Sequence, residues 1–357
     1  MKRLLLSLLL AAGLLCGCGA SSEPASAQIF AMDTVMDLTA YGKGGAAALD
    51  ETVEIIRELE FMLDRTSSES EVSAVNRRAG EPTAISETLA QLLTAAQQYS
   101  LATGGAFDVT ISPVMDAWGF TQETQQVPEQ AELAQLLPLV DSSCLAPAKT
   151  ADGSYSVTLG RDQAIDLGGI AKGYVSDCVE HRFRGWAVES GMVSLGGNVF
   201  VRGTKPDGTP WRVGVQSPDD PERLAGILSL TDAYAVTSGG YQRYFEQDGK
   251  TYHHIIDPAD GCPADSGLIS VTVVAPANGA PGAHDTVVTP GSGAMCDAFS
   301  TALFVMGEEE AVSFWRSGRF AFDLVLITDD GRCLVTAGLE DRFEENKESG
   351  YAYAIIR

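Results

Sequence analysis

The chain has 357 residues, 45% of them hydrophobic, which is enough to bury the core of one large domain or of two coupled domains. Its 48 acidic and 24 basic residues give a formal net charge of −24, so no nucleic-acid partner is expected, because that partner requires a basic face. An anionic ligand would have to be met by local cations or by a metal.

The N-terminus has the pattern of an export signal. Two basic residues precede an apolar run, Leu4 to Leu15, which is too short for a comfortable membrane span. The sequence LCGC at its end looks like a bacterial lipobox and predicts a lipoprotein signal peptide over 1–17, lipid attachment at Cys18 and a flexible tether over 18–28. We therefore expect a protein anchored at the extracytoplasmic, periplasmic face of a bacterial membrane. A plain secretory signal cut elsewhere is the alternative.

Helices and strands follow one another irregularly along the rest of the chain. Apolar residues at helical spacing predict helices over 46–63, 86–103, 129–136, 171–183, 297–306 and 308–316. Extended apolar runs predict strands over 29–41, 155–159, 164–167, 186–195, 199–202, 211–215, 227–236, 251–256, 268–274 and 322–327. This order lacks regular βαβ alternation and predicts an α+β domain with mixed sheets over 29–357.

One segment, about 275–295, is rich in Gly, Pro and Ala and has no hydrophobic periodicity. This composition predicts a surface insertion loop, because long loops without regular structure are usually functional or disordered. A lid over a functional site is the alternative.

The motif DLGGIAKGYVSD, 166–177, places two glycines between a predicted strand and a predicted helix. Gly168 and Gly169 allow the backbone to approach a ligand closely, and the helix N-terminus offers free N–H groups. With Lys172 as an added cation, the motif suits a phosphate group. A tight strand-to-helix turn without a ligand explains the glycines equally well.

The motif CDAFSTALFVMG, 296–307, contains Asp297 and Thr301, which lie four residues apart and share one face of a helix. A carboxylate and a hydroxyl are hard oxygen ligands that suit Mg²⁺. The alternative is structural, with Asp297 as a helix cap and Thr301 bonded back to a carbonyl.

The motif HHIIDP begins with two adjacent imidazoles. On a strand, neighbouring side chains point to opposite faces, so His253 and His254 are not expected to bind one metal. One is expected to be structural and one functional, because a neutral imidazole can take a proton from a hydroxyl. Upstream, residues 103–120 combine glycines, aromatic rings and Asp108, which suits either a pocket for a planar ligand or core packing.

Taken together and in this order, these segments resemble the ApbE family, the FAD:protein FMN transferases. The resemblance extends over essentially the whole mature chain. The segments that carry it are AMDTVM (31–36), GGAFDVTISPVMDAWGF (104–120), DLGGIAKGYVSD (166–177), SLGGNVFVRGTKPDGTPWRVGVQSP (194–218), AVTSGGYQRYFEQDGKTYHHIIDPADGCP (235–263) and CDAFSTALFVMG (296–307).

The resemblance implies an ApbE-like, T-fold-related catalytic domain with its active site in a cleft between two subdomains. It implies Mg²⁺-dependent transfer of FMN from FAD to a Ser or Thr hydroxyl of a target protein, with release of AMP. The acceptors would be exported or membrane-bound subunits of electron-transfer complexes.

By the same resemblance, His254 would be the general base that activates the acceptor hydroxyl. The residues expected at FAD are Met32, Ala106, Phe107, Asp108, Gly168, Gly169, Lys172 and Ile256. The expected metal ligands are Asp297, Thr301 and the backbone carbonyl of Ala171, with Ser300 close enough to contribute. The family often has Met-Gly-Thr where this chain has Met32-Asp33-Thr34, and the added carboxylate could alter flavin or metal affinity.

Three other functions remain open at this point. A Mg²⁺-dependent FAD pyrophosphatase would use the same residues with water as the acceptor. A flavin-binding lipoprotein without catalysis would need the ring pocket but not Asp297, Thr301 or His254. A serine hydrolase would use Ser238, His254 and Asp257, but no GxSxG elbow surrounds that serine.

Overall fold

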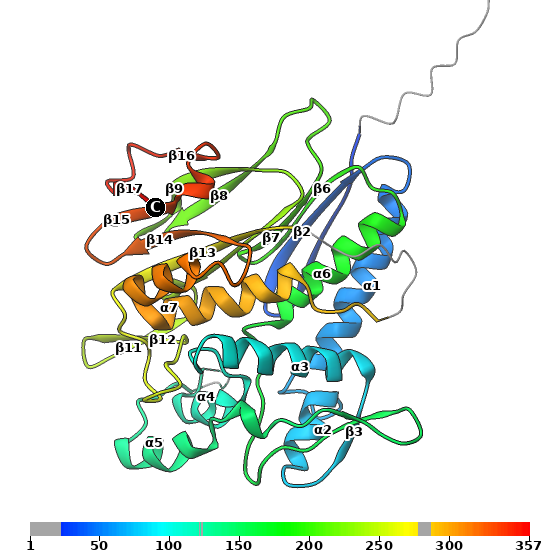
Figure 1. Ribbon diagram of the computed structural model, residues 1–357, viewed down its shortest axis with the longest axis vertical. Helices are drawn as coiled ribbons and strands as arrows, with labels where there is room; N and C mark the ends of the chain where they lie inside the picture. The colour runs from blue at the N-terminus through cyan, green and yellow to red at the C-terminus, as the bar shows by residue number, and fades with distance from the viewer. Residues whose placement is uncertain (1–22, 121, 123, 278–286) are drawn as a thin grey trace, which may run out of the picture.

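The computed structural model describes residues 23–120, 122, 124–277 and 287–357. A nine-stranded sheet forms its centre, with helices α1 (Gly45–Leu63), α6 (Ala171–Gly185) and α7 (Ser292–Arg316) packed on one face (Figure 1). A small three-stranded sheet covers the other face. The α+β architecture with mixed sheets is therefore confirmed. The predicted signal peptide and Cys18 lie outside the described residues.

The central sheet is antiparallel throughout except for its last pair, β15 and β17, which is parallel. Its strands, in spatial order, are β1 (Ala25–Ala31), β2 (Thr34–Tyr41), β6 (Ser190–Leu195), β7 (Asn198–Arg202), β10 (Ala233–Gly239), β13 (Leu268–Pro276), β14 (Asp323–Thr328), β15 (Arg332–Thr336) and β17 (Ala352–Ile356). The small sheet consists of β16 (Phe343–Glu345), β9 (Asp220–Leu230) and β8 (Trp211–Ser217).

Alternating side chains divide the interior into two main cores. On β14, Leu324 and Leu326 pack into the core beneath the helices, whereas Val325 and Ile327 pack against the small sheet. A sheet that is covered on both faces needs apolar residues at successive positions, which explains the continuous run DLVLIT in this strand.

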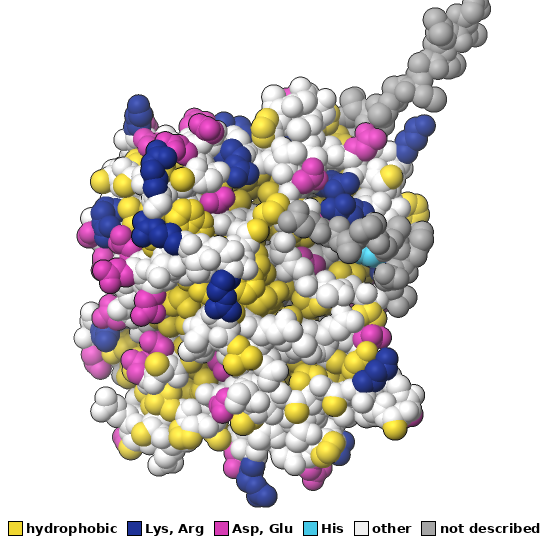
Figure 2. All heavy atoms as spheres, in the orientation of Figure 1, with side chains coloured by type: hydrophobic (Ala, Val, Ile, Leu, Met, Phe, Trp, Pro, Cys, Tyr) yellow, Lys and Arg dark blue, Asp and Glu magenta, His cyan; other side chains and the backbone are white. Residues whose placement is uncertain are grey.

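A smaller part lies below the long helices in the view of Figure 1 and carries the remaining short elements. These are α2 (Glu71–Arg77), α3 (Glu87–Ala102), α4 (Ser112–Trp118), α5 (Gln130–Leu136), the sheet of β3 (Thr83–Ile85), β5 (Tyr155–Val157) and β4 (Ala148–Lys149), and the hairpin of β11 (Tyr244–Gln247) and β12 (Lys250–His253). Among the described residues, no helix is both long and apolar enough to cross a membrane. On the face in Figure 2, Lys and Arg side chains are interspersed with acidic ones.

The strand predicted over 29–41 is a hairpin of two strands, β1 and β2. Its turn is formed by Met32 and Asp33, with φ angles of 49° and 60°. Two consecutive positive φ angles are typical of a tight hairpin turn, which usually contains Asn or Gly, so the Met-Asp pair gives no recognisable turn signal. Because β1 begins at Ala25, the end of the tether predicted over 18–28 belongs to the sheet.

Other predicted strands also differ from the structure. The strand predicted over 251–256 ends at His253 as part of β12, so His254 lies in the bend that follows. Residues 164–167 belong to no sheet of the described chain, because the Asn76 side chain takes the place of a neighbouring strand: it accepts from the Ile165 N–H at 2.8 Å and donates to the Ile165 carbonyl at 3.0 Å. The strand predicted over 227–236 is divided at Asp232, with φ 46°, between β9 of the small sheet and β10 of the central sheet.

Helix α7 begins earlier than predicted, at Ser292, inside the insertion loop expected over about 275–295. At the other end of that loop, β13 continues to Pro276, so regular structure shortens the loop from both sides. Gly307 interrupts the helix with φ 78° and ψ 177°, at the boundary between the two helices that the sequence predicts there. Residues 278–286 lie outside the described part.

Helices α6 and α7 approach each other most closely at two glycines. A Cβ on Gly173 would collide with the carbonyl oxygen of Gly293, and a Cβ on Gly293 would collide with the carbonyl oxygen of Gly173. The absence of both side chains therefore allows the first turns of the two helices to lie in direct backbone contact.

We expect Gly173→Ala to lower the free energy of unfolding by about 3 kcal/mol, because the added methyl group overpacks a contact between two backbones. Urea unfolding followed by circular dichroism would measure this loss. Gly153→Ala is the control, since Gly153 has φ 89° and open space around it, and should lose only about 1 kcal/mol from its left-handed backbone. Equal losses in the two variants would contradict the packing argument.

Candidate active site

Three segments that are far apart in the sequence meet at Gly169, just before α6. A Cβ on this glycine would lie 3.1 Å from the ring of Phe107 and 3.6 Å from the hydroxyl oxygen of Thr301. Gly169 therefore leaves room between the loop that carries Phe107 and the helix that carries Thr301. The structure brings together three of the motifs that the sequence singles out.

Asp297 is the only carboxylate among the expected metal ligands, and its residue is 5% exposed. One of its oxygens, Oδ2, accepts a hydrogen bond of 2.7 Å from the N–H of Gly173, in the first turn of α6. Burial raises the pKa of Asp297, whereas Lys172 and the Gly173 N–H group lower it. The carboxylate is thus anchored through one oxygen to a helix N-terminus, where negative charge is favoured.

Three hydroxyl groups lie together where β10 meets α7. Ser238 Oγ, on β10, is 2.8 Å from Ser300 Oγ and 3.3 Å from Thr301 Oγ1. Ser300 also donates to the carbonyl of Asp297 at 2.9 Å. The Ser238 hydroxyl is therefore engaged with α7 and not with His254, which argues against the serine hydrolase arrangement. The contact of Ser238 with the Ser300 and Thr301 hydroxyls was not predicted. The only local sequence feature at Ser238 is TSGG at the end of a strand.

His253 has a structural environment. Its Nδ1 accepts from the Ile255 N–H at 3.3 Å, so the proton is on Nε2, which lies 3.1 Å from the carbonyl oxygen of Ala264 and donates to it. The ring also packs edge-on against Phe304, with 5.4 Å between ring centroids. Both nitrogens are occupied by the protein.

His254 differs because, within the part of the chain that the structure describes, only one of its nitrogens has such a partner. Its Nδ1 lies 3.1 Å from the carbonyl oxygen of Arg243 and must donate to it, since a carbonyl can only accept. The other nitrogen, Nε2, is then unprotonated and can accept a proton. The pKa of His254 is lowered to about 4, chiefly by burial and also by the nearby cations Arg243 and Lys172, while the hydrogen bond to the Arg243 carbonyl acts in the opposite direction. The imidazole is therefore neutral near pH 7.

Lys172 connects the base to the carboxylate electrostatically, because it lowers the pKa of both His254 and Asp297. Within the described residues, its ammonium group takes part in no ion pair. It lies in the first turn of α6, beside Ala171, where helix N–H groups and the dipole favour an anion. This end of α6 can hold a phosphate group.

A hollow of about 610 Å³ is lined by Ala106, Asp108 and Asp257, but not by His254, Lys172 or Asp297. Its walls come from the loop over 103–108, the turn over 257–259 and one side of α7 around Met306. Ala106 and Asp108 both line it, but the Asp108 carboxylate accepts four hydrogen bonds from Ser100, Thr110 and Ser142. Asp108 therefore shapes this wall, and the hollow is large enough to receive part of a dinucleotide.

Met32, Gly168 and Ile256, which are also predicted to contact the flavin, do not line this hollow. Met32 is half-buried in the β1–β2 turn and donates its N–H to Glu60, while its neighbour Asp33 forms an ion pair with Arg243 at 3.4 Å. This turn therefore lies beside the residue whose carbonyl orients His254, a contact that no local sequence signal predicts.

Gly168 and Ile256 occupy structural positions. The Gly168 N–H donates to Asp166 at 2.8 Å, and the other oxygen of Asp166 accepts from Arg65 at 2.8 Å. Ile256 is buried in a separate small core with Trp118 and three further apolar residues of the lower part. The glycine turn before α6 is thus held by a partly buried arginine, Arg65, that the sequence analysis did not single out.

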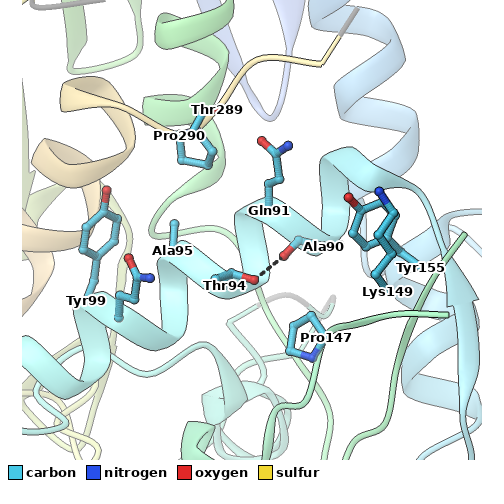
Figure 3. Close-up of a pocket in the computed structure, with 11 residues that line it drawn as sticks. Ala90, Gln91, Thr94, Ala95, Tyr99, Pro147, Lys149, Tyr155, Thr289 and Pro290 are labelled. Carbon is cyan, nitrogen blue, oxygen red and sulfur yellow. Dashed lines mark hydrogen bonds between the residues drawn. The ribbon is translucent and has the colours of Figure 1, made fainter. Parts of the chain in front are cut away.

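A second hollow, of about 260 Å³, contains none of the predicted site residues. Figure 3 shows one wall of it formed by α3, with Gln91, Thr94 and Tyr99, and another by Lys149 and Tyr155. Lys149 lies over the Tyr155 ring at 5.3 Å, so its charge is already partly satisfied there.

Comparison with known proteins identifies the family. Residues 32–322 match the sequence model of the ApbE family. The chain belongs to the ApbE family. It is 30% identical over 351 residues to an FAD:protein FMN transferase of Treponema pallidum (strain Nichols), covering 92% of each chain. It is 32% identical over 307 residues to one of Klebsiella pneumoniae (strain 342), covering 85% of this chain and 89% of the relative.

Solved structures of this family have the same fold. The ApbE protein of Thermotoga maritima matches with a TM-score of 0.76 and 27% identity, over 91% of this chain and 98% of that one. The apo flavinyl transferase ApbE of Pseudomonas stutzeri matches with a TM-score of 0.75 and 26% identity, over the same shares of the two chains. The fold that the ApbE resemblance implies is therefore confirmed.

We expect the His254 imidazole in the folded protein to remain neutral, with its proton on Nδ1, from about pH 8 down to about pH 5, because burial and two cations disfavour its charged form. Nitrogen-15 NMR of the imidazole ring during a pH titration would show this. In urea the same residue should titrate near its ordinary value of about 6.5. A midpoint near 6.5 in the folded protein would contradict the assigned environment.

Proposed function

We propose that this chain transfers FMN from FAD to a Ser or Thr hydroxyl of a target protein, with release of AMP and dependence on Mg²⁺. As a member of the ApbE family the chain is a transferase, and the names of its relatives support transfer of flavin. The observation that carries the finer proposal is the combination of a neutral imidazole, His254, with Lys172 and the oxygen ligands of α7 around one site.

The oxygen groups at this site fit Mg²⁺. The described residues contain no group of three His, Cys, Asp or Glu side chains that could hold a metal ion. The set of Asp297 with the Ser300 and Thr301 hydroxyls has one carboxylate and neutral hard oxygens, and Mg²⁺ accepts such a small set because water and phosphate complete its shell. Burial disfavours the charge of Asp297, and a bound cation would compensate it. When bound, Mg²⁺ would neutralise charge on the phosphates.

The chain's own residues account for the other parts of the reaction. Lys172 and the first turn of α6 would bind the phosphates of FAD and orient them. His254 Nε2 would take the proton of the acceptor hydroxyl. The hydroxyl oxygen would form a bond to the FMN phosphorus while the bond from that phosphorus to the oxygen bridging it to AMP breaks, so AMP leaves with that oxygen.

We also propose, from the N-terminal sequence, that lipid on Cys18 anchors the protein at the extracytoplasmic face of a bacterial membrane, where exported or membrane-bound subunits of electron-transfer complexes would be its acceptors. We expect cells expressing the wild type to incorporate a labelled fatty acid into the protein, and Cys18→Ala to prevent this. Equal labelling of both forms would contradict lipidation at Cys18.

The transfer reaction itself can be tested with the purified protein, FAD, and an exported protein that carries a candidate Ser/Thr segment. We expect a fluorescent acceptor band in a denaturing gel and an equal amount of AMP by chromatography, both lost with EDTA and restored by Mg²⁺. AMP and FMN without a labelled acceptor, for every acceptor tested, would favour a pyrophosphatase. Bound FAD without AMP would favour a flavin carrier.

We expect His254→Ala to reduce transfer at least about 100-fold, the lower end of the range for loss of a general base, while the affinity for FAD changes little. Single-turnover labelling and fluorescence titration with FAD would measure the two quantities. Thr251→Ala is the matched control, because Thr251 is exposed on β12, the strand that ends just before His254, and should leave both values unchanged. Transfer at the wild-type rate by the His254 variant would exclude it as the base.

A further inference from the structure

The geometry points to Asp177 as a positioning residue: from α6 it fixes the first turn of α7 and thereby holds the metal-ligand set of α7 against the phosphate-binding end of α6. The inference rests on the proposed function only for its metal readout. Asp177 lies outside that ligand set and outside the hollow, and nothing in the mechanism above uses it.

Asp177 forms a cap that α7 does not supply for itself. The N-cap residue of α7 is Gly291, which has no side chain to accept a hydrogen bond. Instead, Oδ2 of Asp177 accepts from the N–H groups of Gly291 at 2.8 Å and Ala294 at 2.9 Å, and Oδ1 accepts from the N–H of Gly293 at 2.7 Å. The first turn of α7 is thus attached to α6 through three charge-assisted hydrogen bonds.

The attachment is reciprocal. Asp297 on α7 accepts from the Gly173 N–H in the first turn of α6, while Asp177 on α6 accepts from the first turn of α7. Between the two carboxylates, Gly173 and Gly293 are in backbone contact, so neither helix can slide without breaking bonds. We call these four residues the helix clasp: Gly173, Asp177, Gly293 and Asp297.

The position of the clasp explains its importance for the site. Lys172 precedes Gly173 directly, and Asp297, Ser300 and Thr301 follow Gly293 within three helical turns. A shift of the first turn of α7 would therefore change the distance from Asp297 to Lys172 and the alignment of the hydroxyls with Ser238. Asp177 acts on these groups through the backbone and touches none of the proposed ligands.

The test is Asp177→Asn, which preserves the shape of the side chain but presents an NH₂ group to at least one backbone N–H. We expect Mn²⁺, used as a paramagnetic substitute for Mg²⁺ and followed by electron paramagnetic resonance, to bind at least about 10-fold more weakly. We also expect the KM for Mg²⁺ in transfer to rise while kcat at saturating Mg²⁺ changes little. A purely structural role would lower stability without moving these values in the folded protein.

Glu180→Gln is the matched control, because Glu180 is a buried carboxylate one turn further along α6 that pairs with Arg184. It should lower stability and leave Mn²⁺ affinity unchanged. If Asp177→Asn does not fold, Asp177→Glu gives the same test, since it keeps the charge but moves the carboxylate away from the N–H groups of Gly291, Gly293 and Ala294. Wild-type Mn²⁺ affinity in a folded Asp177 variant would overturn the inference.

A second readout does not depend on the metal. The Gly173 amide proton is held by Asp297, and its hydrogen exchange, measured by NMR without metal, should be at least about 10-fold faster in Asp177→Asn than in the wild type. If the wild type binds no Mn²⁺, the metal part of the proposed function fails, and this exchange rate still decides the role of Asp177. An unchanged rate would overturn it.

Discussion

The helix clasp is the contact on which the candidate site depends. Two carboxylates buried between α6 and α7 would be unfavourable if each lacked a partner, and each finds its partners at the N-terminus of the other helix. The close approach of α6 and α7 requires glycine on both helices. It also places Lys172 near enough to Asp297 to lower the pKa of that carboxylate. The central sheet contributes Ser238 on β10, whose hydroxyl contacts the Ser300 hydroxyl of α7.

The chain as a whole is negatively charged, but the charged side chains close to His254 are the cations Lys172 and Arg243. The net charge is −24, yet Lys172 and Arg243 are the charges that act most directly on His254, and both disfavour its protonated form. An acidic protein can therefore bind an anionic dinucleotide, because a few cations and a helix N-terminus determine the local potential. The negative charge of Asp166 beside the glycine turn is offset in part by Arg65, which pairs with both Asp166 and Asp116.

Local sequence patterns predicted those parts of the site that lie within one element. Asp297 and Thr301 reach Gly173 and Gly169 from one side of α7, as their spacing of four indicates. The two histidines have different environments, but alternation along one strand is not the reason, because β12 ends at His253 and His254 lies in the bend that follows. Contacts between elements were not predictable in this way. Asp177 caps a helix that begins more than one hundred residues later, and no periodicity within either helix encodes that pairing.

The partner of His254 has a consequence for catalysis under the proposed function. A backbone carbonyl fixes the tautomer but carries no charge, so it stabilises the protonated ring far less than a carboxylate would. With a pKa of about 4, the free imidazole is a weak base. An anionic diphosphate bound at Lys172 would offset the nearby cations and raise that pKa, so His254 would become an effective base only when FAD is in place. Binding of the donor would then precede activation of the acceptor hydroxyl.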